Sequence, residues 1–132
     1  MYWIETEIEI AASPQRIWSI LMDFSAYPEW SPFIRSLSGD VTPGQLLRAS
    51  IQLPGAKVMT FRPKMRVAER LKELRWLGHL LLPGLFDGEH YFQLAALANS
   101  RTRFVQGEKF SGMLVSLLPP GWGLAPKRVL WR

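Results

Sequence analysis

The sequence predicts an α+β domain built on a curved antiparallel sheet. Residues 2–10 alternate between two faces, which is typical of a half-buried strand. A short helical segment follows, and from residue 33 onward the pattern is strand-like, with Gly, Pro, Asn and Asp between the strands. One strand, a helical pair and then a run of strands favour helices packed on one sheet.

The first strand and helix have clear boundaries. One face of residues 2–10 is mainly apolar, and the other carries Trp3 and three glutamates. Ser13 and Pro14 then form an N-cap and a proline at the first helical position. Apolar residues at helical spacing predict a helix that ends near Asp23. The prolines of residues 27–32 predict a short turn or a second small helix there.

The rest of the chain predicts about six strands. They are expected at residues 33–37, 46–53, 58–67, 71–76, 86–96 and 102–110. Pro63 lies inside the third of these and predicts an edge or a bulge, because proline has no N–H to donate to a ladder. The apolar segment 80–85 predicts either a lid over a cavity or a packed cap.

Composition limits the classes of function. The chain has 132 residues, of which 48% are hydrophobic and 20% charged, so we expect one globular domain over residues 1–132. There are no cysteines, which excludes disulfides, thiolate nucleophiles and cysteine metal sites. The only histidines are His79 and His90, too few for a histidine-rich zinc site. We therefore expect no metal and no cofactor.

The net charge of +5 is unevenly spread. Residues 1–30 sum to −4, so the remainder carries +9, mostly as single basic residues between apolar ones. This pattern is typical of solvated strand faces, and nucleic acid is not an expected partner. The longest uncharged run, residues 110–126, is 17 residues long and contains three prolines, which is unsuited to a membrane span. The N-terminus is acidic, unlike a signal peptide, so we expect a cytoplasmic protein.

The last two strands bring a polar pair together. If their hairpin turns at Asn99, His90 faces Glu108, Phe92 faces Gln106 and Leu94 faces Phe104, all on the concave face. A histidine oriented by a carboxylate in an apolar pocket is a candidate acid/base pair. The alternative, which we weigh more heavily, is a buried pair whose members only satisfy each other, because no nucleophile accompanies them.

Aromatic residues offer a second candidate feature. Trp18 is expected in the core, whereas Trp30 and Trp76, with Phe61 and Met65, could be either core or a wall for a flat apolar ligand. Arg75 is expected on the opposite face from Trp76 and therefore solvated. Arg62, Lys64 and Arg66 alternate with apolar residues and are also expected on a wet outer face.

Two blocks of residues resemble a known superfamily. The first is Ile10 to Trp18 with Asp23-Phe24 and Tyr27-Pro28-Glu29-Trp30-Ser31-Pro32-Phe33. The second comprises Phe61-Arg62-Pro63, Leu74 to Gly78, Leu85 to Phe92, Thr102-Arg103-Phe104 and Glu108 to Gly112. Over roughly residues 3–115 the chain resembles the START-like or SRPBCC superfamily, in its polyketide cyclase/dehydrase-like branch. The resemblance implies a helix-grip fold, in which a curved sheet wraps a long C-terminal helix over a cavity for lipids, sterols or polyketides.

The C-terminus departs from that pattern. Residues 113–132 contain three prolines and two glycines, so the usual long helix is expected to be absent or replaced. Truncation, a frameshift or natural variation would each produce this atypical tail, residues 116–132. Without its usual cover, the concave face would expose an apolar patch that favours a homodimer or another partner.

Three hypotheses for function follow. The first is non-catalytic binding of a hydrophobic small molecule, lipid or polyketide-like, on the concave face. The second is a polyketide cyclase or dehydratase that uses His90 and Glu108, and the third is an interaction module. The expected ligand-binding residues are Trp30, Phe61, Met65, Trp76, His90, Phe92, Phe104, Gln106, Glu108 and Phe110.

Overall fold

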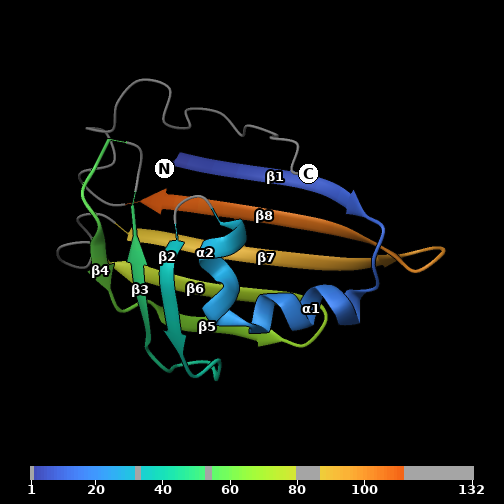
Figure 1. Cartoon of the computed structure of the whole chain (residues 1–132), viewed down its shortest axis with the longest axis horizontal. Helices are drawn as coiled ribbons and strands as arrows, with labels where there is room; N and C mark the ends of the chain where they lie inside the picture. Colours follow the sequence, from blue (N-terminus) through green and yellow to red (C-terminus); the bar gives the residue numbers. More distant parts are fainter. Residues whose placement is uncertain (1, 32–33, 53–54, 80–86, 112–132) are drawn as a thin grey trace.

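The computed structural model describes residues 2–31, 34–52, 55–79 and 87–111 (Figure 1). The elements in these ranges are, in order, β1 (Tyr2–Ile10), α1 (Pro14–Met22), the 3-10 helix η1 (Phe24–Ala26), α2 (Tyr27–Trp30), β2 (Ile34–Gly39), β3 (Leu47–Ile51), β4 (Met59–Phe61), β5 (Lys64–Glu69), β6 (Glu73–His79), β7 (Asp87–Leu97) and β8 (Arg101–Ser111). Segment 80–85, expected to be a lid or a packed cap, and the C-terminal tail, where the long helix was expected to be absent or replaced, lie outside the described residues. None of the helices in the described part is long and apolar enough to cross a membrane.

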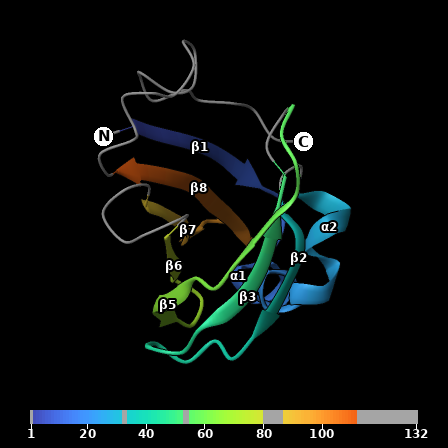
Figure 2. The same ribbon diagram turned by 90° about the vertical axis from the view of Figure 1, so that its left-hand side faces the viewer.

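The strands form two antiparallel sheets. The larger has the order β1-β8-β7-β6-β5, and the smaller has the order β2-β3-β4. A bridge between Leu46 and Lys64, and a hydrogen bond of 2.7 Å from Leu47 N–H to the Pro63 carbonyl, link the two. Both views place the helices and the small sheet on one side of the large sheet (Figures 1 and 2). The α+β fold class predicted from the sequence is confirmed, with the sheet divided into two.

Pro63 explains the division. The sequence predicted one strand over residues 58–67, but the chain forms β4 before this residue and β5 after it, in different sheets. Proline has no N–H for a ladder, although its carbonyl still accepts from Leu47. Pro63 is fully buried, so the break occurs inside the molecule and turns the chain from one sheet into the other.

The core fills the space between the helices, the small sheet and one face of the large sheet, which we call the inner face. Helix α1 begins at the expected cap, where Arg16 N–H donates to the Ser13 hydroxyl at 3.3 Å. The helix buries Ile17, Trp18 and Leu21, so Trp18 is a core residue as predicted. Tyr27 has no exposed surface, and its hydroxyl donates to the Leu21 carbonyl at 2.8 Å. The Tyr27 ring also contacts Trp76 of β6 and Phe92 of β7, which holds the helical segment over these strands.

The β7–β8 hairpin has the expected register. His90 pairs with Glu108, Phe92 with Gln106 and Leu94 with Phe104. The turn places Asn99 and Ser100 at φ of 60° and 55°, in the left-handed region that asparagine tolerates best among non-glycine residues. Leu71, expected to begin a strand, instead has a φ of 67° in a turn, and β6 begins at Glu73.

A candidate binding site on the inner face

His90 is held from two sides on the inner face. Its Nδ1 hydrogen-bonds to Oε2 of Glu108 on the neighbouring strand. Its ring stacks on the indole of Trp76, with centroids 5.2 Å apart and planes 14° apart, and meets Phe92 edge-on at 4.6 Å. The His90 side chain is 14% exposed and that of Glu108 28% exposed. The pairing predicted from the hairpin register therefore exists, and an aromatic shell fixes its orientation.

Two buried polar atoms near this pair have no partner. Nε2 of His90 and Nε1 of Trp30 form no hydrogen bond with any residue that the structure describes. Both rings pack against Phe92, with centroids 4.6 and 5.9 Å from that ring. An unsatisfied buried polar group costs about 1–3 kcal/mol, so a ligand that satisfied either atom would gain that interaction.

The two orphan atoms have different chemistry. Because Nδ1 of His90 is bonded to Glu108, Nε2 is the ring nitrogen left free, and it is an acceptor in the neutral ring with its proton on Nδ1. Nε1 of Trp30 can only donate. A hydroxyl group can donate to the first and accept from the second.

Two glycines face each other beside the pair. Gly78 of β6 pairs with Gly88 of β7, two residues along the strands from the Trp76–His90 pair. The ring of Phe61 from β4 lies over Gly78, so closely that no side chain would fit there. A β-carbon at Gly88 would lie 3.1 Å from Oε1 of Glu108 and 3.7 Å from the Phe110 ring. Because Gly78 has no side chain, the Phe61 ring can lie against the backbone of β6. Gly88 in the same way leaves room for Glu108 and Phe110 beside β7.

The remaining predicted residues divide into core and edge. Met65, Trp76, Phe92, Phe104 and Phe110 are buried, and all but Phe110 belong to the hydrophobic core. Trp30, Phe61 and Gln106 are half-buried. The aromatic wall expected from the sequence is thus largely packed against protein, and the half-buried residues around His90 are those that a ligand would reach first.

A separate hollow of about 680 Å³ lies elsewhere in the described part of the chain. It is found where the start of α1 meets the β5–β6 turn and strands β7 and β8, lined among others by Pro14, Leu71, Gln93 and Arg103. None of the ten predicted ligand-binding residues lines it. The hollow mixes side chains from both faces of the sheet, so we do not assign the ligand to it.

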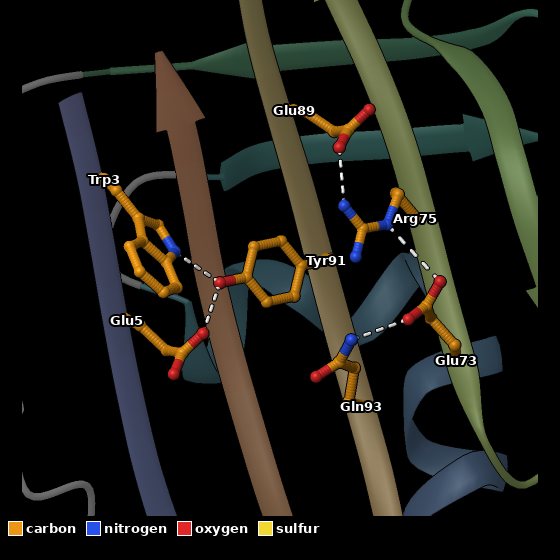
Figure 3. A network of polar contacts seen from close by, with 7 residues as sticks. All are labelled: Trp3, Glu5, Glu73, Arg75, Glu89, Tyr91 and Gln93. Atoms are coloured by element: carbon orange, nitrogen blue, oxygen red, sulfur yellow. Dashed lines mark hydrogen bonds and ion pairs between the residues drawn. The ribbon is translucent and has the colours of Figure 1, made fainter. Parts of the chain in front are cut away.

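The outer face carries a polar network that the sequence did not predict (Figure 3). The hydroxyl of Tyr91 accepts from Nε1 of Trp3 at 2.6 Å and donates to Glu5 at 2.5 Å. Tyr91 is 2% exposed, because its ring lies over Gly107 of the intervening strand β8. Burial and then the hydrogen bond to Glu5 raise the pKa of Tyr91 to about 12. The absence of a side chain at Gly107 is the signal that could have revealed this contact between β7 and β1.

Arg75 joins the same network. It binds Glu89 at 2.5 Å and Glu73 at 3.3 Å, and its guanidinium lies 4.6 Å from the centre of the Tyr91 ring. Burial lowers the pKa of Arg75, but the bonds to Glu89 and Glu73 outweigh that effect and the pKa is raised. Its side chain is 18% exposed, so the prediction that Arg75 is solvated was wrong, although it lies on the expected face. Within the described ranges no group of His, Asp and Glu side chains is arranged to hold a metal.

Comparisons with solved structures support the fold. A START superfamily protein from Mycobacterium smegmatis is 22% identical, with a TM-score of 0.68, over 90% of this chain and 81% of that chain. The Zhui aromatase/cyclase from Streptomyces sp. R1128 is 17% identical, with a TM-score of 0.67, over 84% and 68%. A protein from Chromobacterium violaceum is 17% identical, with a TM-score of 0.68, over 90% and 84%. At these identities the likeness concerns the fold alone.

A comparison of sequences defines the family. No curated protein matches the chain. A family model described as polyketide cyclase/dehydrase and lipid transport matches residues 1–129, which confirms the superfamily predicted from the two sequence blocks. Because that match spans nearly the whole chain, the protein belongs to the polyketide cyclase/dehydrase and lipid transport family.

Proposed function

We propose that this domain binds a hydrophobic small molecule bearing a hydroxyl group, on the inner face beside His90, without transforming it. The observation that carries the proposal is the pair of unpartnered buried atoms, Nε2 of His90 and Nε1 of Trp30, around one phenylalanine ring. Apolar ligand sites typically combine an aromatic wall with a few placed polar groups. The description of the family, which includes lipid transport, is consistent with this role.

Glu108 has a positioning role in this account. Its carboxylate holds the Nδ1 side of His90, so Nε2 is directed away from Glu108. Trp76 holds the imidazole plane by stacking. The polar end of the ligand would meet Nε2 of His90 and Nε1 of Trp30, and its apolar body would lie against the half-buried Phe61.

A matched pair of probes tests this proposal. 2-Naphthol and 2-methylnaphthalene have similar shapes, but only the first carries a hydroxyl. One added hydrogen bond contributes about 0.5–1.5 kcal/mol, so the wild-type protein should bind 2-naphthol roughly 2- to 10-fold more tightly. His90→Phe should reduce that preference, because only Nε1 of Trp30 remains to bind the hydroxyl, and it should still bind 2-methylnaphthalene. Failure of the folded wild-type protein to bind either probe would refute the proposal.

A second candidate function rests on the same histidine. An imidazole oriented by a carboxylate at one nitrogen and free at the other has the arrangement of a general base. On this hypothesis the protein is a cyclase or dehydratase, with His90 as the base and Glu108 orienting it. Turnover of a polyketide-like substrate by the wild type, lost in both His90→Gln and Glu108→Gln variants that remain folded, would favour it over simple binding.

A further inference from the structure

The segment 41–68 contains five basic residues and no acidic residue. These five, Arg48, Lys57, Arg62, Lys64 and Arg66, are all exposed. None forms an ion pair with a residue that the structure describes. The sequence outside the described ranges contains no Asp or Glu at all, so no acidic side chain there can neutralise them.

The register places two of these cations opposite each other. Ala49 pairs with Phe61, and Leu46 pairs with Lys64, so Arg48 lies across from Arg62. Ser50 and Thr60, two positions further along, share a side-chain hydrogen bond of 2.9 Å, which puts them and the two arginines on the same face. Ala49 and Leu47 are buried on the other side. Leu46, Arg48, Arg62 and Lys64 therefore form one solvent-facing surface, which we call the basic face.

This juxtaposition is unfavourable without an anion. Like charges directly opposite each other on a sheet are destabilising. On the large sheet, by contrast, Arg75, Arg101 and Arg103 are each paired with a glutamate. The basic face lies where β3 meets β5, the junction of the two sheets (Figure 2). Its two opposed arginines are available to an external anionic partner.

Exposed aliphatic side chains on and near the basic face indicate which kind of anionic partner it suits. Leu46 is 55% exposed on the basic face itself, and Val58 and Met59 are 53% and 37% exposed at the edge strand β4. Cations beside exposed aliphatic residues suit the surface of an anionic bilayer, where the charges meet headgroups and the aliphatic groups enter the interface. A single-stranded nucleic acid would instead favour exposed aromatic residues beside the cations, on which its bases stack, and the residues exposed here are aliphatic.

We propose that the basic face docks the protein on anionic membranes. This proposal does not depend on the ligand site, since His90 lies on the inner face of the other sheet. Docking of this kind would bring a hydrophobic cargo to the lipid phase from which it comes. The binding should be electrostatic in large part and should weaken as salt is raised.

Vesicle binding tests the proposal directly. Wild-type protein should bind vesicles of phosphatidylcholine mixed with phosphatidylglycerol and should not bind phosphatidylcholine alone. Each basic residue near an anionic surface contributes about fivefold in affinity, so Arg48→Gln/Arg62→Gln should bind roughly 20- to 30-fold more weakly. The control Arg16→Gln/Arg70→Gln removes two exposed, unpaired cations elsewhere and should bind as the wild type does. Leu46→Ser should cost roughly tenfold and keep the salt dependence.

Three results would overturn the proposal: no binding to anionic vesicles, an equal loss in the control variant, or binding to duplex DNA at salt concentrations where vesicles do not bind. His90→Phe serves as a separate check. It should leave vesicle binding unchanged, so a failure of the membrane proposal and a failure of the ligand proposal are distinguishable.

Discussion

The imidazole of His90 lies almost parallel to the indole of Trp76, with ring centroids 5.2 Å apart. This stacking and the bond from Nδ1 to Glu108 together hold the imidazole so that Nε2 is directed away from Glu108. The Trp76 indole also contacts Phe24, Tyr27 and Phe92, so the same side chain belongs to the core and to the candidate site. Stability and the orientation of the His90 ring are therefore coupled at this residue.

Replacing Trp76 should be costly. The residue is 4% exposed, and Trp76→Ala should lower the free energy of unfolding by about 3–5 kcal/mol through lost packing and the cavity that remains. Urea unfolding followed by circular dichroism measures this. Ile20→Ala on α1 is the control, because Ile20 is 44% exposed and its loss should cost less than about 0.5 kcal/mol. Equal effects of the two substitutions would show that Trp76 is not packed as described.

The His90–Glu108 pair should show strong non-additivity. Glu108→Leu leaves Nδ1 of His90 without its partner and should cost about 1–3 kcal/mol of unfolding free energy. His90→Phe/Glu108→Leu removes both polar groups and should cost clearly less than the sum of the single changes. A double-mutant cycle in urea measures the difference. Simple additivity would mean that the two side chains do not interact.

Gly107 should tolerate no side chain while Tyr91 is present. Gly107→Ala would place a β-carbon against the Tyr91 ring and break its bonds to Trp3 and Glu5, at a cost of about 1–3 kcal/mol. In a Tyr91→Ala background the same change should be almost neutral, because the obstructing ring is gone. Thermal unfolding of the four variants tests this. A cost that persists in the Tyr91→Ala background would contradict the arrangement in Figure 3.

Tyr91 should also make stability sensitive to high pH. Its pKa is raised to about 12, by burial first and then by the bond to Glu5, whereas an unfolded tyrosine titrates near 10. Above pH 10 the unfolded chain loses a proton that the native state keeps, so this stabilisation, at most about 2–3 kcal/mol, is present below pH 10 and lost as pH rises toward 12. Tyr91→Phe lacks the effect. The difference in unfolding free energy between the wild type and this variant should narrow above pH 10, and a constant difference would contradict the raised pKa.

The hairpin carrying the site was predictable from the sequence, because alternation and one turn at Asn99 determine every pair along β7 and β8. The break at Pro63 was only partly predictable. The missing N–H predicts an irregularity, but the transfer of the chain between two sheets depends on the tertiary bridge from Leu46 to Lys64. The position of Trp30 against Phe92 could not be derived, since it depends on how the helical segment packs on the sheet.

The outer network was missed for a different reason. Trp3, Glu5, Arg75 and Tyr91 alternate with apolar residues, so periodicity assigns them to the solvated face. They are on that face, but Gly107 of β8 leaves room for the Tyr91 ring to lie against the backbone. Trp3 and Glu5 then bond to its hydroxyl, and Arg75 lies over its ring. Period-two patterning identifies the face of a strand and does not give the burial of long side chains on that face.

Nitrogen NMR of the imidazole groups during titration with 2-naphthol would show whether His90 binds the hydroxyl group of the probe. The chain has only two histidines, and His79 is bonded to Asp87 away from the site, so it serves as an internal control. We expect the chemical shift of His90 Nε2 to change as this nitrogen accepts a hydrogen bond from the hydroxyl of 2-naphthol. The signals of His79 should not respond. Saturation with ligand that leaves the His90 signals unchanged would contradict this prediction.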